Sequence, residues 1–264
     1  MNLLKRVFAM ILRHYYLLST SWPRVLELIY WPTLNLMVWG FMQQFLSTRT
    51  DLFANAGGIL VSAILLWDCL FRSQLGVTLS FIEEFWSRNL VNLSVSPLRP
   101  AEMILALLAT SFIRTSIGVG GATIIAYYVF DFTIVEEVIA FGAYFFNLMI
   151  MGWSLGLIIC AVLMKYGLAA ESLAWAALFL VQPLCGVFYP IDVLPVWLQY
   201  FSYIFPATYI FEGMREIFFN NNFVIDLLVN AIFLNLLYVF TAIIIFLKMN
   251  KHVRKSGSIL LNGE

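Results

Sequence analysis

Six stretches of the chain are each long and apolar enough to cross a lipid bilayer, and this feature limits the fold more than any other. A transmembrane helix needs about 20 mostly apolar residues to span the hydrocarbon core. The windows lie at 26–46, 56–80, 103–130, 138–164, 172–190 and 228–248. Because 62% of the 264 residues are hydrophobic and only 11% are charged, an ordinary soluble domain is excluded. We therefore predict an all-α integral membrane protein with six transmembrane helices, forming one transmembrane domain over 1–264.

Charged residues are distributed unevenly between the connections of these helices. With six spans, most basic residues fall on one side, at Lys5, Arg6, Arg13, Arg24, Arg88, Arg99, Lys165, Lys248, Lys251, Arg254 and Lys255. The opposite connections hold Arg49 and Arg215 and an acidic majority, at Asp51, Asp131, Glu136, Glu137, Asp192, Glu212, Glu216 and Asp226. The positive-inside rule then places both termini in the cytoplasm. Since acidic and basic residues number 15 each, bulk charge does not indicate nucleic-acid binding.

The segment 1–22 is amphipathic. Its apolar residues recur at helical spacing, with Arg6 and Arg13 off the stripe formed by Leu4, Val7, Ile11, Leu12, Tyr15 and Leu18. This pattern is typical of a helix that lies in the cytoplasmic membrane interface. A cytoplasmic extension of the first span is the alternative. Arg13 and His14 interrupt the apolar run and no small-residue cleavage site follows, so we do not expect a cleaved signal.

Groups that could perform bond chemistry are few. The two histidines, His14 and His252, lie near opposite ends of the chain, which argues against a histidine metal site or a catalytic arrangement. No phosphate-binding G-x-x-x-x-G-K-[ST] motif is present. We expect close helix packing, not phosphate binding, at Gly118, Gly120, Gly121, Gly152 and Gly156. The cysteines stand singly and are interpreted as small core residues, at Cys69, Cys160 and Cys185. We therefore predict no catalytic residue and no metal site.

Three ionisable residues fall inside the predicted spans. Asp68 and Arg72 are four residues apart in the second span, hence on one helix face, and Arg114 lies at a comparable depth in the third. Charges at such depth should be paired and should face protein or water. One interpretation is a buried ionic clamp between two helices. The other is a polar lining of a substrate path.

An aromatic run broken by prolines follows the fifth window. Because each interior proline removes an amide donor, residues 189–209 cannot form one helix. The region 191–226 should fold back as short re-entrant helices at the outer side, with aromatic residues at headgroup level, at Trp197, Tyr200, Tyr203 and Tyr209. Glu212, Arg215 and Glu216 have the spacing of pairs on one helix. The region would serve as a lid over an exit or as an interfacial anchor.

The same region resembles the signature of ABC-2-type transporter permeases, the membrane subunits of a class of ATP-driven exporters. The residues that carry the resemblance are Pro190, Leu194, Pro195, Trp197, Pro206, Tyr209 and Arg215. A second match is IEEFWSRNLVNLSVSPLRPAEM at 82–103, which has the family's acidic start, basic residue, leucine-rich turn and Ser-Pro-x-Arg ending. Length and predicted spans agree with the family's plan over the whole chain.

The resemblance implies that 82–103 is a coupling segment that docks on a separate ABC ATP-binding subunit, with an ordinary solvated loop as the alternative. The residues nominated for this contact are Glu83, Glu84, Trp86, Arg88, Pro97 and Arg99. ATP and Mg²⁺ are then expected on the partner and no cofactor on this chain. A second copy of the permease and membrane lipids are the other expected partners, and the bacterial inner membrane is the expected location.

The resemblance also implies that spans one and five line the substrate path. Candidate path residues, for which helix packing is the alternative role, are Asn35, Trp39, Gln43, Trp175, Phe179 and Gln182. Aromatic surface with sparse amides suits an amphipathic or lipophilic substrate, drug-like or lipid, moved outward. A polysaccharide or glycolipid exporter is the alternative within the class. A stand-alone secondary transporter and a membrane-embedded enzyme are the alternatives outside it.

Overall fold

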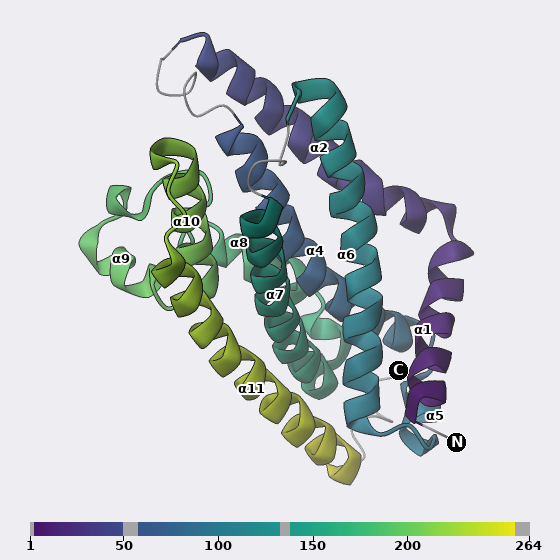
Figure 1. Ribbon diagram of the computed structural model, residues 1–264. Helices are drawn as coiled ribbons and strands as arrows, with labels where there is room; N and C mark the ends of the chain where they lie inside the picture. The colour runs from purple at the N-terminus through teal and green to yellow at the C-terminus, as the bar shows by residue number, and fades with distance from the viewer. Residues whose placement is uncertain (1–2, 50–57, 133–137, 257–264) are drawn as a thin grey trace.

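The computed structural model describes residues 3–49, 58–132 and 138–256, and these residues form helices joined by turns (Figure 1). The elements are α1 (Leu3–Ser19), α2 (Trp22–Ser47), α4 (Ile59–Trp86), α5 (Leu90–Val95), α6 (Pro100–Phe130), α7 (Val138–Tyr166), η2 (Gly167–Ala170), α8 (Leu173–Val181), η3 (Ile191–Val193), α9 (Val196–Ser202), α10 (Pro206–Asn220) and α11 (Ile225–Ser256). Within the described ranges, five helical segments are long and apolar enough to cross a membrane, namely α2, α4, α6, α7 with η2, and α11. The predicted helical fold is confirmed, and five of the six windows fall on these helices.

The fifth predicted span, 172–190, is not one helix. Only α8 is regular, and it ends at Val181 because Pro183 follows and Gly186 adopts a left-handed φ of 60°. The segment still connects the two ends of the bundle. Ala170 and Ala174 belong to one buried cluster, whereas Leu178, Cys185 and Val187 belong to the other. The expected continuous helix is therefore wrong, and Pro183 is the sequence signal that indicates the break.

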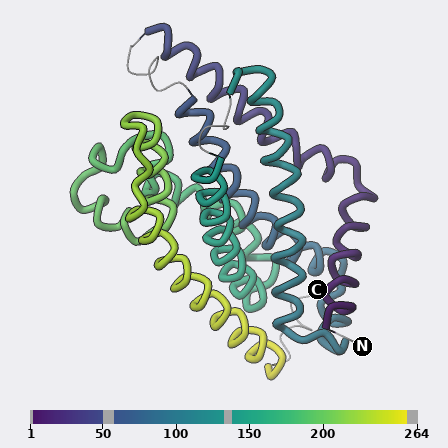
Figure 2. Tube along the Cα trace, viewed as in Figure 1, coloured from purple at the N-terminus to yellow at the C-terminus, as the bar shows by residue number. Residues whose placement is uncertain are grey.

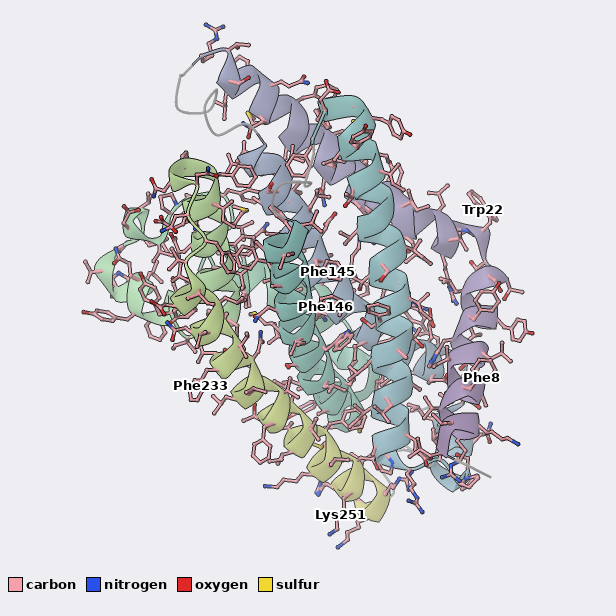
Figure 3. The ribbon with its side chains drawn as sticks, in the orientation of Figure 1. Phe8, Trp22, Phe145, Phe146, Phe233 and Lys251 are labelled. Atoms are coloured by element: carbon pink, nitrogen blue, oxygen red, sulfur yellow. The ribbon has the colours of Figure 1, made fainter. Side chains whose placement is uncertain are left out.

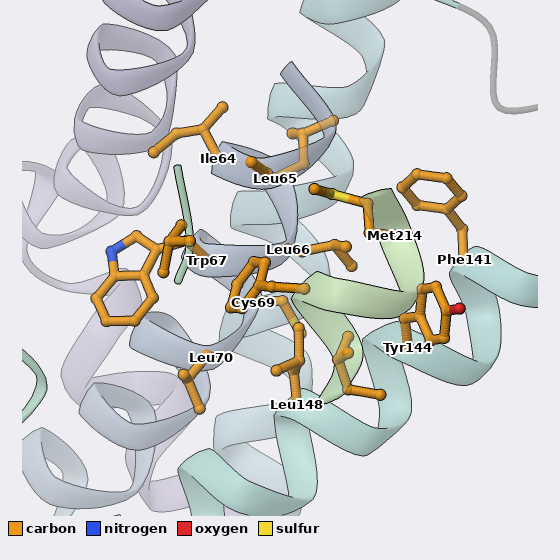
Figure 4. Close-up of a cluster of buried hydrophobic side chains, with 14 of the residues drawn as sticks. Ile64, Leu65, Leu66, Trp67, Cys69, Leu70, Phe141, Tyr144, Leu148 and Met214 are labelled. Carbon is orange, nitrogen blue, oxygen red and sulfur yellow. The ribbon is translucent and has the colours of Figure 1, made fainter. Parts of the chain in front are cut away.

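Helix α4 forms the centre of the bundle and is buried along nearly its whole length, between α7, α6 and α2. Figure 4 shows its neighbours in the core, with Tyr144 and Leu148 reaching in from α7 and Met214 from α10. Trp67 belongs to the same cluster but projects from α4 on a different side from Tyr144 and Met214 (Figure 4). One face of α4 therefore packs in the core, and the face that carries Trp67 lines the cavity described below.

Glycines allow α7 to approach α4 closely. A Cβ on Gly152 would lie 2.0 Å from Ser73 Oγ and 2.6 Å from the Leu70 carbonyl oxygen. A Cβ on Gly156 would lie 3.0 Å from the Gln74 carbonyl oxygen. The predicted close packing is thus confirmed for the G-x-x-x-G pair. Gly118 is also tightly packed, whereas Gly120 has no neighbour within 4 Å.

We expect Gly152→Ala to destabilise the protein by roughly 1–3 kcal/mol, because the backbone of α4 would have to move away from α7. The matched control is Gly142→Ala in the same helix, where a Cβ meets no atom within 4 Å. Thermal unfolding of both variants in detergent measures the difference. Equal midpoints for the two variants would contradict the close packing.

Helix α1 is separate from α2, because the chain turns at Ser21, which is extended with φ −119° and ψ 98°. Figure 2 shows the sharp change of direction. Leu4 and Tyr15 of the predicted apolar stripe are exposed, and Phe8 and Trp22 point away from the bundle in Figure 3. The predicted helix is confirmed, and a continuous extension of the first span is not what the structure has.

The region after α8 forms short pieces, each of which begins at or next to a proline. Pro190 precedes η3, Pro195 precedes α9, and Pro206 is the first residue of α10. The predicted broken structure is confirmed. Helices α9 and α10 lie at one end of the bundle, while α5, the start of α1 and the end of α11 lie at the other (Figure 1).

Candidate functional site

A cavity of about 720 Å³ lies between α2, α4, α6 and α8. It contains five of the six residues predicted to line a path, namely Asn35, Trp39, Trp175, Phe179 and Gln182. Gln43 lies outside, where its Oε1 accepts a hydrogen bond from the Leu60 amide at 3.0 Å. The structure thus brings the α2 and α8 candidates together on one surface and gives Gln43 a role at the start of α4.

One part of the cavity is aromatic. Trp39 stacks on Phe188 with ring centroids 3.8 Å apart, and Phe71 contacts Phe179 with centroids 5.7 Å apart. Trp67 belongs to the same wall. This surface offers a large apolar area with fixed ring geometry, which suits the hydrocarbon or aromatic body of a ligand.

The other part of the cavity is ionic and contains a buried pair that the sequence did not indicate. The Arg114 guanidinium donates from Nη2 to both oxygens of Glu83, at 3.0 and 3.1 Å, and Arg24 Nη1 lies 3.7 Å from Glu83 Oε1. Both Arg114 and Glu83 are buried. The clamp expected between Arg114 and Asp68 is therefore wrong, because Arg114 is bound by Glu83, which lies about four helical turns further along α4 than Asp68.

Asp68 and Arg72 line the cavity with Arg114. The Asp68 carboxylate is 2% exposed and accepts a hydrogen bond from the Asn35 side chain. The Arg72 side chain crosses Gly118 of α6, where a Cβ would lie 2.9 Å from its Cδ. The structure therefore places the three intramembrane charges on a cavity wall, as expected for a polar lining.

The predicted coupling segment 82–103 divides into a buried and an exposed part. Glu84 is fully buried, where it accepts hydrogen bonds from Arg13 Nε at 2.9 Å and Asn89 Nδ2 at 2.7 Å. His14 Nε2 lies 3.4 Å from the same carboxylate. Glu83 and Glu84 thus contact this chain instead of a surface available to a partner, which corrects their nomination. The other four nominated residues are exposed, namely Trp86, Arg88, Pro97 and Arg99.

Helix α1 is held to the bundle through its charged face. Arg6 donates to Glu102 from Nε at 2.8 Å and from Nη2 at 2.5 Å, while Arg13 binds Glu84. Hydrogen bonding to Glu102 raises the pKa of Arg6 above its ordinary value. Sequence reasoning missed these contacts. The signal was the seven-residue spacing of the two arginines, which places them on one helix face.

The outer signature residues brace the turn after α8. Arg215 donates to the Gly186 carbonyl oxygen and to Glu212 Oε1, both at 2.7 Å. Glu212 Oε1 also accepts the Ile191 amide at 2.9 Å. The predicted Glu212–Arg215 pair is confirmed, whereas Glu216 binds Asn220. Leu194 is half-buried between η3 and α9.

Surface aromatics of this region have a different arrangement. Trp197 and Tyr200 are exposed, and the Tyr209 hydroxyl donates to the Tyr203 carbonyl oxygen at 3.2 Å. Exposed tryptophan and tyrosine are typical of the level of lipid headgroups.

Comparison with known proteins finds a family whose model matches most of the chain. A family model described as ABC-2 type transporter matches residues 6–219, which include α1, the cavity, the α4–α6 turn and α10. No curated protein matches the chain at a significant level. The family's membrane domains are transport permease subunits that are not themselves catalytic. Since the match covers most of the chain, the protein belongs to the ABC-2 type transporter family.

Proposed function

We propose that the chain is the permease subunit of an ABC exporter that moves an amphipathic or lipophilic substrate outward, driven by a separate ATP-binding subunit. Two permease copies would form the transporter in the bacterial inner membrane, with both termini in the cytoplasm. ATP and Mg²⁺ would be bound and used on the partner chain.

The observation that carries this proposal is the 720 Å³ cavity, which joins an aromatic wall to a cluster of charges. Pockets of roughly 300–1,000 Å³ hold drug-sized ligands. An amphipathic molecule matches this wall, since it combines an apolar body with polar groups as the cavity combines aromatic and charged residues.

The geometry supports a route by which a partner could act on the cavity. The exposed residues Trp86–Arg88 form the last residue of α4 and the turn after it, and α4 contributes Asp68, Arg72 and Glu83 to the cavity wall. A partner that binds the turn more strongly in one conformation would shift the population of α4 positions. The cavity would then open alternately to the two sides.

The test is ATP-dependent uptake of fluorescent amphiphiles into inside-out vesicles that contain the complex. We expect uptake, and expect Trp39→Ala and Phe179→Ala to weaken apparent affinity roughly tenfold each through lost ring contacts. Tyr128→Ala, on the exposed surface of α6, is the control. Uptake only into right-side-out vesicles, or unchanged affinity in both cavity variants, would contradict the proposal.

The topology has its own test. Asp192→Cys should react with a membrane-impermeant thiol reagent from outside intact spheroplasts, and Lys251→Cys only after lysis. Both positions are exposed, whereas the native Cys69, Cys160 and Cys185 are buried and should stay unlabelled. The reverse labelling pattern would overturn the proposed orientation.

A further inference from the structure

We propose that the cavity ligand is an anionic amphiphile whose phosphate or carboxylate group is bound by Arg72. This inference rests on the proposed function and narrows its substrate class. Its physical basis is an excess of hydrogen-bond donors among the charged residues of the cavity, together with the aromatic residues that lie beside them.

The Arg72 guanidinium is the key group. Its Nε is buried without a hydrogen-bond partner, and within the described residues no salt bridge reaches the side chain. Asp68 and Glu27 act on it only through longer-range electrostatics. Packing against Gly118 fixes the side chain on the cavity wall. A guanidinium offers five N–H donors in a planar fork that matches a carboxylate or phosphate.

The carboxylates of the cavity leave little room for a cationic ligand. Glu83 is bound by Arg114 and lies near Arg24, while Asp68 is almost fully buried and accepts the Asn35 hydrogen bond. Asp68 and Glu27 both act on the Arg72 charge, and Glu27 is the exposed one of the two, which makes it the accessible competitor of a ligand for Arg72. Arg114 Nε is buried and lacks a partner among the described residues, which adds a further unmatched donor.

Charged and aromatic residues are neighbours along the cavity, since Asp68 and Arg72 alternate with Trp67 and Phe71 on α4. Arg24 near the start of α2 and Glu83 near the end of α4 mark the end of the bundle that holds α5. Trp39 and Phe188 lie toward the other end. A bound amphiphile would therefore place its anionic group at Arg72, midway along α4, and its apolar body along the rings.

Quenching of tryptophan fluorescence by brominated amphiphiles tests the inference, since Trp39, Trp67 and Trp175 line the cavity. The full chain in phosphatidylcholine nanodiscs is titrated with bromododecyl phosphate, bromododecanol and bromododecyl trimethylammonium. We expect the phosphate to bind at least about tenfold more tightly than the alcohol or the cation. Inorganic phosphate should not displace it. Displacement at similar concentrations would show that free phosphate is the ligand and would overturn the inference.

Three variants make the test specific. Arg72→Gln should lose the preference for the phosphate and keep the affinity for the alcohol, whereas Glu27→Gln should strengthen phosphate binding by removing the competing charge. Arg72→Lys should retain part of the preference, which keeps the test valid if Arg72→Gln does not fold. Arg49→Gln removes an exposed cation outside the cavity and should change nothing.

The outcomes separate this inference from the proposed function. Equal binding of the three amphiphiles, unaffected by Arg72 or Glu27, would overturn the anion preference and leave an amphiphile site in place. Absence of saturable quenching by every amphiphile would overturn both.

Discussion

Replacing Glu83 with glutamine is expected to remove about 3–5 kcal/mol of folding free energy, a large part of the stability of a typical domain. The reason is the buried Arg114 guanidinium, whose Nη2 donates to both Glu83 oxygens at 3.0 and 3.1 Å. Glutamine leaves that cation in a low-dielectric site without its counter-charge. Yield of monodisperse protein and its thermal midpoint in detergent measure the loss.

A double variant distinguishes the cost of an unpaired buried charge from the cost of altered side-chain packing. Glu83→Gln with Arg114→Gln removes both charges, and replacing a buried pair by neutral groups is often nearly neutral, so we expect it to recover most of the lost stability. Glu216→Gln, at a half-exposed carboxylate on α10, is the surface control. A Glu83→Gln variant as stable as this control would show that the pair does not hold α4 to α6.

Reversing the charge of Arg88 is the second change with a large expected effect, here on export. Arg88 is exposed in the turn after α4 and has a left-handed φ of 51°. If this turn is the contact for the ATP-binding subunit, Arg88→Glu should reduce ATP-dependent uptake into inside-out vesicles by tenfold or more. A charge of the wrong sign at this contact would weaken binding of the subunit, and each loss of roughly 1.4 kcal/mol lowers that affinity tenfold. Thermal stability of the permease should stay unchanged.

Glu84→Lys provides the contrast. Glu84 lies four residues before Arg88, but it is buried against Arg13, His14 and Asn89, so the reversed charge would face the Arg13 guanidinium and hydrogen-bond donors instead of a counter-charge. We expect this variant to fail to accumulate in the membrane. Arg49→Glu reverses an exposed cation in the turn that follows α2 and is the control for Arg88→Glu. Full export by Arg88→Glu would remove the turn from the coupling contact.

Five of the six spans predicted from hydropathy are long helices, because a run of about 20 apolar residues has few alternatives in a bilayer. Hydropathy ended the second span at residue 80, whereas α4 continues to Trp86. The continuation depends on Arg114 and Arg13, which are distant in sequence and neutralise Glu83 and Glu84. Such long-range pairing is not visible in a hydropathy window. The prediction of a continuous fifth span was wrong for a local reason, Pro183, which interrupts an otherwise apolar run.

The sequence predicted which residues line the candidate site better than it predicted which groups those residues contact. Asp68 and Arg72 stand out in the sequence because charges are costly at that depth, and both line the cavity. Which group each contacts depends on how α2 and α6 rotate against α4. That rotation is set by packing at small residues such as Gly76, where a Cβ would lie 2.9 Å from the Ser111 backbone. Helical spacing alone could not assign Arg114 to Glu83.

The most direct test of the account is transport by the purified chain with and without an ABC ATP-binding subunit recovered with it from native membranes. In proteoliposomes of the same lipid, we expect amphiphile transport only when both chains and ATP are present, with hydrolysis abolished when the ATP-binding subunit is left out. Transport by this chain alone without nucleotide, or ATP hydrolysis by this chain alone, would contradict the account.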